Sequence, residues 1–232
     1  MLRNGRIRFD PYVEGAPMVT PRWMPWAGLA SILGGLTALL LTPAFATAYF
    51  LAYAEYDPAP FWMAAVEPRL GSLVTFSSPD GVYETYGRIY DLVYVLFLPA
   101  VFGLHEFHQG SGIRGEKRGF SLLVTGLLAA FVGVAGDYWA NGIGFAIEVL
   151  GLLIMIIGAT TYGIAVLRTK VVPRWCAWLL VSSGPSALAF TAVIGHIPSG
   201  PTFFFGVSWL IVGFMLLFKT AIRPLAPDTE TP

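Results

Sequence analysis

Five polar side chains lie within or at the edges of long apolar stretches, where an ionisable group is costly and therefore a functional candidate. They are Asp91, Tyr94, Asp137, Glu148 and His196. At helical spacing Asp91 and Tyr94 share one stripe, whereas Asp137 and Glu148 belong to stripes rich in glycine and alanine, which face neighbouring membrane helices. Carboxylates and an imidazole at one level could relay protons, bind a cation or bind a divalent metal of unknown identity.

A structural role is the competing interpretation of this polar layer. Asp91 lies about one helical turn from Arg88, and Asp137, Glu148 and His196 also fall near the outer ends of their apolar stretches. Groups this close to the interface can reach water, cap a helix or pair with Arg88 at low cost. Both interpretations stay open from the sequence.

Two further histidines stand near the opposite, inner boundary. His105 and His108 are three residues apart, so they share a helix face and could supply two metal ligands. A third ligand is not evident nearby, and Glu106 points to another face of the helix. The zinc-protease motif requires histidines four residues apart. An interfacial histidine pair near a helix C-terminus is therefore the favoured interpretation.

No complete catalytic or cofactor motif is present. The sequence lacks a nucleophile elbow, a phosphate-binding loop, a redox cysteine pair and a haem-attachment motif. Cys176 is its single cysteine, so the chain can form no internal disulfide. We therefore predict no cofactor, and catalysis is not the favoured function.

The elements that must position these residues are membrane-spanning helices. The chain has 232 residues, of which 56% are hydrophobic and 12% charged, against roughly a quarter charged in soluble proteins. A helix needs about 20 apolar residues to cross the hydrocarbon layer. Glu148 is the only charge in 143–167, so no face of that segment suits water, and unbroken apolar runs do not suit a β-barrel. Six apolar stretches predict an all-α bundle of six spans: 27–51, 89–104, 120–136, 143–167, 175–194 and 202–218.

Cationic residues predict the orientation of this bundle, because lysine and arginine beside spans favour the cytoplasm. With six spans, only Arg69 and Arg88 of the fourteen cations lie on the outer side. We therefore predict one transmembrane domain over 1–232 in the inner membrane, with a cytoplasmic N-terminal segment, 1–25, and a cytoplasmic tail, 220–232.

The outer loop, 53–87, is acidic and allows two local structures. Ser78 as N-cap, followed by Pro79 and Asp80, predicts that a helix begins here and continues into the second span. The alternative is a hairpin that turns at the same proline. The acidic side chains of this loop could attract external cations or simply reflect the topology; they are Glu55, Asp57, Glu67, Asp80 and Glu84.

Three spans contain an internal proline, which removes a backbone donor and predicts a kink. These prolines are Pro43, Pro99 and Pro185. Ser182 and Ser186 flank Pro185 and offer hydroxyls to the freed backbone groups.

Three functions are compatible with these features. The favoured one is a non-catalytic accessory or structural subunit that contacts the lipid bilayer and either a membrane-protein partner or a second copy of itself; no nucleic-acid partner is predicted. The second is a small secondary transporter with a polar site between the kinked second and fifth spans, because Pro99 and Pro185 occupy corresponding positions of two inverted halves. The third is a metal-dependent membrane hydrolase that uses the outer carboxylate and histidine layer.

Three short stretches resemble uncharacterised bacterial multi-span membrane proteins. They are 86–90 before the second span, 172–175 at the start of the fifth, and 195–201 between the last two spans. The resemblance implies a bacterial inner membrane, and it implies no known activity and no site residues.

Overall fold

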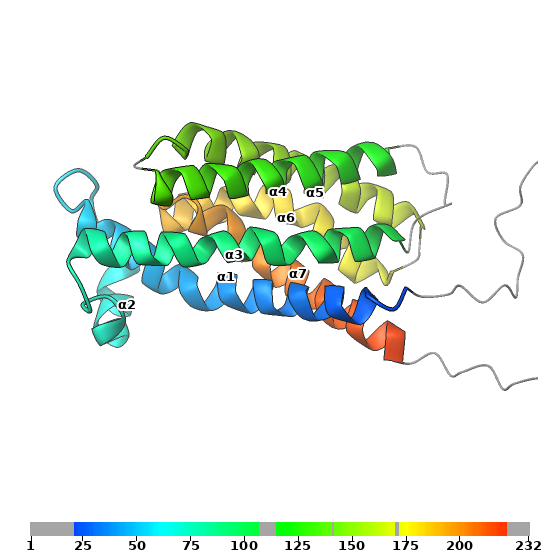
Figure 1. Cartoon of the computed structure of the whole chain (residues 1–232), viewed down its shortest axis with the longest axis horizontal. Helices are drawn as coiled ribbons and strands as arrows, with labels where there is room; N and C mark the ends of the chain where they lie inside the picture. The colour runs from blue at the N-terminus through cyan, green and yellow to red at the C-terminus, as the bar shows by residue number, and fades with distance from the viewer. Residues whose placement is uncertain (1–20, 107–114, 141, 170–171, 222–232) are drawn as a thin grey trace, which may run out of the picture.

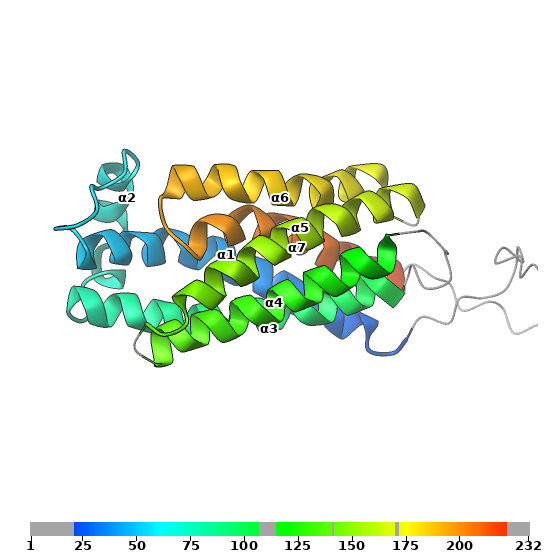
Figure 2. The same ribbon diagram turned by 90° about the horizontal axis from the view of Figure 1, so that it is seen from above.

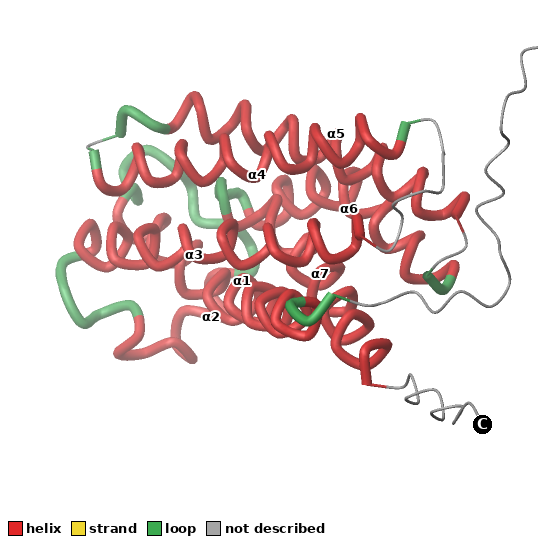
Figure 3. Tube along the Cα trace, turned by 45° about the vertical axis from the view of Figure 1, so that its right-hand side comes forward, coloured by secondary structure: helices red, strands yellow, loops and turns green. Residues whose placement is uncertain are grey.

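The structure is a computed structural model that describes residues 21–106, 115–140, 142–169 and 172–221. Within these residues all regular structure is helical (Figures 1 and 3). The helices are α1 (Met24–Ala52), α2 (Met63–Leu70), α3 (Pro79–Glu106), α4 (Glu116–Trp139), α5 (Phe145–Thr169), α6 (Arg174–Ile194) and α7 (Ser199–Ala221), with a short 3-10 helix, Gly71–Leu73, before α3.

Six of these helices, all except α2, are long and apolar enough to cross a membrane. Each overlaps one of the six stretches predicted from the sequence; five begin within four residues of the predicted start, whereas α3 begins ten residues earlier, at Pro79. The prediction of an all-α membrane bundle is therefore confirmed, and the chain is a multi-pass membrane protein.

The six long helices form a closed ring. In ring order, α1 packs against α3, α3 against α4, α4 against α5, α5 against α6, α6 against α7, and α7 returns to α1. The helices run roughly along one axis (Figures 1 and 2). The first and last described residues lie at the same end, here called the termini end, and α2 lies at the other, the α2 end. Which end faces the cytoplasm stays a prediction.

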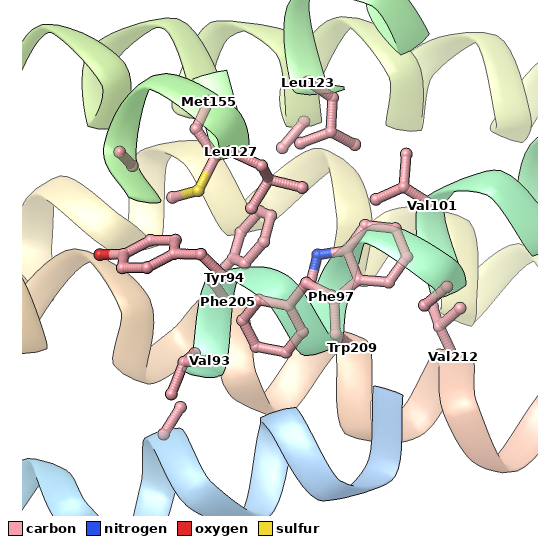
Figure 4. Packing of buried hydrophobic residues seen from close by; sticks show 14 of the residues in the cluster. Val93, Tyr94, Phe97, Val101, Leu123, Leu127, Met155, Phe205, Trp209 and Val212 are labelled. Carbon is pink, nitrogen blue, oxygen red and sulfur yellow. The ribbon is translucent and has the colours of Figure 1, made fainter. Parts of the chain in front are cut away.

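The centre of the ring is packed with aromatic side chains. Phe97 of α3 and Phe205 of α7 have ring centroids 5.4 Å apart, and Phe205 lies 5.7 Å from Trp209. Met155 and Leu127 close this cluster from α5 and α4 (Figure 4). Aliphatic and aromatic contacts from four helices thus hold the ring together.

Glycines bring α4 and α5 into backbone contact. A Cβ atom at Gly126 would overlap the backbone of Met155, and one at Gly151 would overlap the backbone of Ala130. Gly126 and Gly133 are one heptad apart, so they repeat on one face of α4. Small residues at such spacing allow van der Waals packing between helices where lipid provides no hydrophobic drive.

The interface between α1 and α7 is built in the same way. A Cβ atom at Gly28 would lie 2.8 Å from the carbonyl oxygen of Gly213, and one at Gly35 would lie 2.6 Å from that of Gly206. These two glycine interfaces join the first three spans to the last three. The two halves of the chain are therefore connected by helix contacts that reach the backbone.

The segment before α3 confirms the predicted helix start and shows that the hairpin alternative is wrong. Helix α3 begins at Pro79, and the hydroxyl oxygen of Ser78 accepts a 3.2 Å hydrogen bond from the Gly81 amide. The short α2 was not predicted, because it carries Pro68 and buries only Met63. It lies across the end of the bundle.

Helices α1, α3 and α6 continue through their internal prolines. In α6 the hydroxyls of Ser182 and Ser183 donate to the carbonyl oxygens of Leu179 and Leu180, at 3.1 and 2.6 Å. Pro185 is exposed and Ser186 is half-buried. Ser182 therefore bonds the carbonyl of Leu179 and not that of Val181, which Pro185 leaves without its helical donor, and the kinks themselves stay predictions.

Candidate cation site in an acidic aromatic cavity

A cavity of about 470 Å³ opens among the helix ends at the α2 end of the bundle. It is lined by the C-terminal end of α1, the first turns of α3, the end of α4 and the start of α5. Its polar lining consists of four tyrosines and three carboxylates: Tyr49, Tyr53, Tyr83, Tyr138, Asp80, Glu84 and Asp137. Aromatic rings and negative charges therefore share one space.

Hydrogen bonds fix the inner wall of the cavity. The hydroxyls of Tyr83 and Tyr138 lie 2.7 Å apart, and the Tyr83 hydroxyl lies 3.3 Å from Nε2 of His196. Nδ1 of His196 lies 2.7 Å from the hydroxyl of Ser199. A neutral imidazole carries one donor and one acceptor, so both ring nitrogens of His196 can be satisfied. The chain Tyr138–Tyr83–His196–Ser199 connects α4, α3 and the start of α7.

Aromatic contacts hold the α1 side of the cavity. The ring of His196 packs edge-on against Phe45, with centroids 4.7 Å apart, and lies 4.6 Å from the ring of Tyr49. The Tyr49 hydroxyl donates to Oδ2 of Asp57. Contacts at both the ring and the hydroxyl therefore fix the orientation of the Tyr49 side chain, which lines the cavity.

The carboxylates act on the cavity electrostatically. Burial raises the pKa of Tyr53, and the negative charges of Asp80, Asp137 and Glu84 raise it further. The same negative charges that disfavour an ionised tyrosine would stabilise a cation bound in the cavity. The cavity is thus electronegative in its described part.

Arg88, the cation closest in sequence to this region, is committed elsewhere. Its guanidinium forms a 2.9 Å ion pair with Glu84, donates to the backbone oxygen of Tyr138 at 3.1 Å, and lies 5.2 Å from the ring centroid of Trp139. Trp139 in turn donates to Oδ2 of Asp91 at 2.9 Å. In the part of the chain that the structure describes, Arg88 forms its ion pair with Glu84 and none with the five predicted polar residues, so the expected pairing of that layer with Arg88 is replaced by a pairing with Glu84.

The structure divides the predicted polar layer into three environments. Asp137 lines the cavity, and His196 lies behind the cavity wall, where it is 2% exposed. Asp91, Tyr94 and Glu148 are buried among α3, α4 and α5, and Glu148 is fully inaccessible. The charges of Asp137 and Asp91 reach Glu148. These groups are near one another without forming a single ligand cluster.

Within the described residues, no group of three His, Cys, Asp or Glu side chains could hold a metal ion. The described part of the chain therefore gives no support to the predicted metal-dependent hydrolase.

The inner histidine pair is described only in part. Nδ1 of His105 lies 2.5 Å from Oε1 of Glu116, and its ring stacks on Phe120 at 3.9 Å. His105 thus joins α3 to α4 at the termini end. His108 lies outside the described residues.

The two prolines assigned to the predicted transporter site are not brought together. Helix α3, with Pro99, packs against α1, α4 and α7, whereas α6, with Pro185, packs against α5 and α7. The polar site between α3 and α6 is therefore replaced by the cavity between α1, α3, α4 and α5.

Sequence reasoning missed the tyrosines that make this cavity. A signal existed, because Tyr49 and Tyr53 are four residues apart, and Tyr83 follows Asp80 by three residues on the next helix. Each pair shares a helix face. Tyr138 directly follows Asp137, so nothing in its spacing singled it out.

His196 gives the first testable prediction. Burial lowers its pKa from 6.5 to about 3. Below the unfolded value the unfolded chain takes up a proton that the folded protein does not, so folding stability falls as the pH decreases from about 6.5 to about 3, by up to about 1.4 kcal/mol per pH unit. The loss is absent above that window.

The measurement is the unfolding temperature of the purified protein and of His196→Gln at about pH 7.5 and about pH 4.5. Glutamine keeps a polar group toward Tyr83 and does not titrate. We expect a smaller acid-induced decrease in the variant. Equal decreases in both proteins would contradict the assignment.

Comparison of the chain with known protein families, curated proteins and solved structures found no match. The resemblance of the three short stretches thus gains no support, and the bacterial inner membrane stays a prediction.

Proposed function

We propose that the protein is a small membrane carrier for organic cations, which it binds in the cavity at the α2 end. The observation that carries the proposal is the lining of that cavity by four tyrosines and three carboxylates. Aromatic faces attract ammonium groups by about 0.5–2 kcal/mol each, and quaternary ammonium ions are typically bound in aromatic cages. The carboxylates add negative charge that complements the cation. An organic cation does not need them at fixed coordination distances, whereas a metal ion does.

The cavity suits a small organic cation in size as well. Its volume of about 470 Å³ falls within the usual range of small-molecule sites, which is about 300–1,000 Å³. The preorganised wall of Tyr83, Tyr138 and Tyr49 lowers the entropy cost of binding.

The arrangement of the helices supports a carrier rather than a simple receptor. The first half contributes α1, α3 and α4, the second contributes α5, α6 and α7, and both follow the same order round the ring. Corresponding helices of the two halves are three spans apart in chain order, and the chain reverses direction at each span. The two halves therefore run in opposite directions, as in transporters built from inverted repeats. The accessory-subunit hypothesis stays a prediction, since no described contact reports on a partner.

The test is binding and transport of choline by the purified chain in proteoliposomes. Its matched control is 3,3-dimethyl-1-butanol, which has the shape of choline without its charge. We expect choline to raise the unfolding temperature saturably and to accumulate in the vesicles, and the neutral alcohol to do neither. Equal effects of the two compounds, or no effect of choline, would overturn the cation site. Binding without uptake would overturn the carrier.

A further inference from the structure

Glu148 is a buried carboxyl group that the cavity does not use. It lies in the first turn of α5, is 0% exposed, and sits where α5 touches Gly133 of α4. Neither of its carboxyl oxygens has a hydrogen-bond partner within the described residues. An ionised carboxylate in such a place would lose its hydration without compensation.

Two neighbouring polar atoms share this condition. Oδ1 of Asp91 and the hydroxyl of Tyr94 are buried without partners among the described residues, and both groups lie within electrostatic range of Glu148. In Figure 4 the Tyr94 hydroxyl points away from the apolar cluster around Trp209. Unpaired buried polar groups are rare in proteins, and each calls for an explanation such as a functional role or a bound water or ion.

Of the groups that the structure describes, the charged ones that act on Glu148 are both acidic, Asp137 and Asp91. Asp91, Tyr90 and Tyr94 face it from α3, together with Tyr83, and Asp137 and Tyr138 face it from α4. On α6, which also packs against α5, the titratable side chains are Arg174 and Cys176, in its first turn at the termini end. Arg88 is engaged with Glu84.

We infer that Glu148 is an intramembrane proton-binding site, which holds its proton at neutral pH in the cation-free protein. Protonation removes the unpaired negative charge, and the resulting O–H group can donate a hydrogen bond to a neighbouring oxygen. Buried carboxyl groups of this kind serve as proton sites in membrane transporters.

The position of Asp137 couples this proton to the cavity. Asp137 lines the cavity and also acts on Glu148. A cation bound beside Asp137 offsets its negative charge and so favours the ionised form of Glu148. The O–H bond of the Glu148 carboxyl then breaks, the carboxylate keeps the electron pair, and the proton passes to water in the cavity. One positive charge enters the protein as one leaves, and this coupling rests on the proposed cation site.

The proton site is tested without any cation by infrared difference spectroscopy of the full chain in lipid nanodiscs. At neutral pH we expect a C=O stretching band of a neutral carboxylic acid that is lost in Glu148→Gln and kept in Glu55→Gln, because Glu55 is exposed and is not among the groups that act on Glu148. The absence of a Glu148-dependent band at neutral pH would overturn the inference.

A second measurement covers the case in which Glu148→Gln does not fold. Wild-type protein labelled with ¹³C at the glutamate side-chain carboxyl should show an isotope shift of the same band. Of the other described glutamates, Glu55, Glu67, Glu84 and Glu106 are at least partly exposed, and Glu116 lies 2.5 Å from His105. A band that does not shift on glutamate labelling would contradict the assignment.

Proton release upon cation binding tests the coupling separately. In weakly buffered solution, choline should release up to about one proton per bound cation from the wild type and none from Glu148→Gln. Choline binding without proton release would overturn the coupling and leave the cation site intact. A Glu148-dependent band without choline binding would instead overturn the proposed function and leave the proton site intact.

Discussion

Replacement of Gly126 by leucine is expected to prevent the chain from forming a stable bundle. Gly126 lies where α4 meets α5, and even a Cβ atom there would overlap the backbone of Met155. Overpacking a core usually costs about 1–3 kcal/mol because flexible side chains can move aside. A backbone cannot, so the two helices must separate and the aromatic cluster at the centre of the ring must open on that side.

The measurement is the unfolding temperature in detergent together with the yield of monodisperse protein. A loss of about 3 kcal/mol would lower the unfolding temperature by roughly 10 °C in a chain of this size. The matched control is Thr125→Leu, since Thr125 is the preceding residue of α4 and is exposed. We expect the control to behave like the wild type. Similar behaviour of both variants would show that the glycine contact does not determine the packing of α4 on α5.

Neutralising two carboxylates of the cavity is expected to weaken choline binding by about 100-fold. Asp80 and Asp137 line the cavity from α3 and α4, and neither forms a described ion pair. A charge pair at about 4 Å near a protein surface is worth up to about 4 kcal/mol before screening by salt. The loss for Asp80→Asn/Asp137→Asn should therefore shrink as the ionic strength rises.

The matched control is Glu55→Gln/Glu67→Gln. It removes the same net charge from the same end of the bundle, but neither residue lines the cavity. Isothermal titration with choline should give wild-type affinity for this variant. If both double variants weaken binding equally, the effect reflects the overall field of the acidic end rather than a site. Glu84 is left unchanged because it holds Arg88.

Several local features followed directly from short-range sequence patterns. The Ser78, Pro79 and Asp80 run determined where α3 begins, because capping and proline geometry involve only adjacent residues. The glycine and alanine stripes of the third and fourth spans correctly indicated buried faces, as Gly126 and Gly151 show. The short α2 could not be predicted, because its stability depends on its place across the bundle, where Trp62 donates to the carbonyl oxygen of Val193.

The candidate site depended on contacts between distant segments. The hydroxyl pair of Tyr83 and Tyr138 joins residues 55 positions apart, and the bond from Tyr83 to His196 spans 113. Periodicity gives the face of a helix on which a residue lies, but not which helix that face meets. His196 and Glu148 were therefore assigned to one layer, whereas the ring places them in different surroundings.

By itself, the sequence predicted six membrane spans and placed Asp91, Asp137, Glu148 and His196 near one end of them. Length and hydropathy are sufficient for that conclusion, because the thickness of the bilayer sets the length of a span. Only the tertiary structure decided which polar groups share a space: four tyrosines and three carboxylates line a cavity, and Glu148 is buried outside it near Asp91 and Tyr94. The physical reason is that the ring order of the helices arises from close packing between backbones, at glycines whose partners no local pattern specifies.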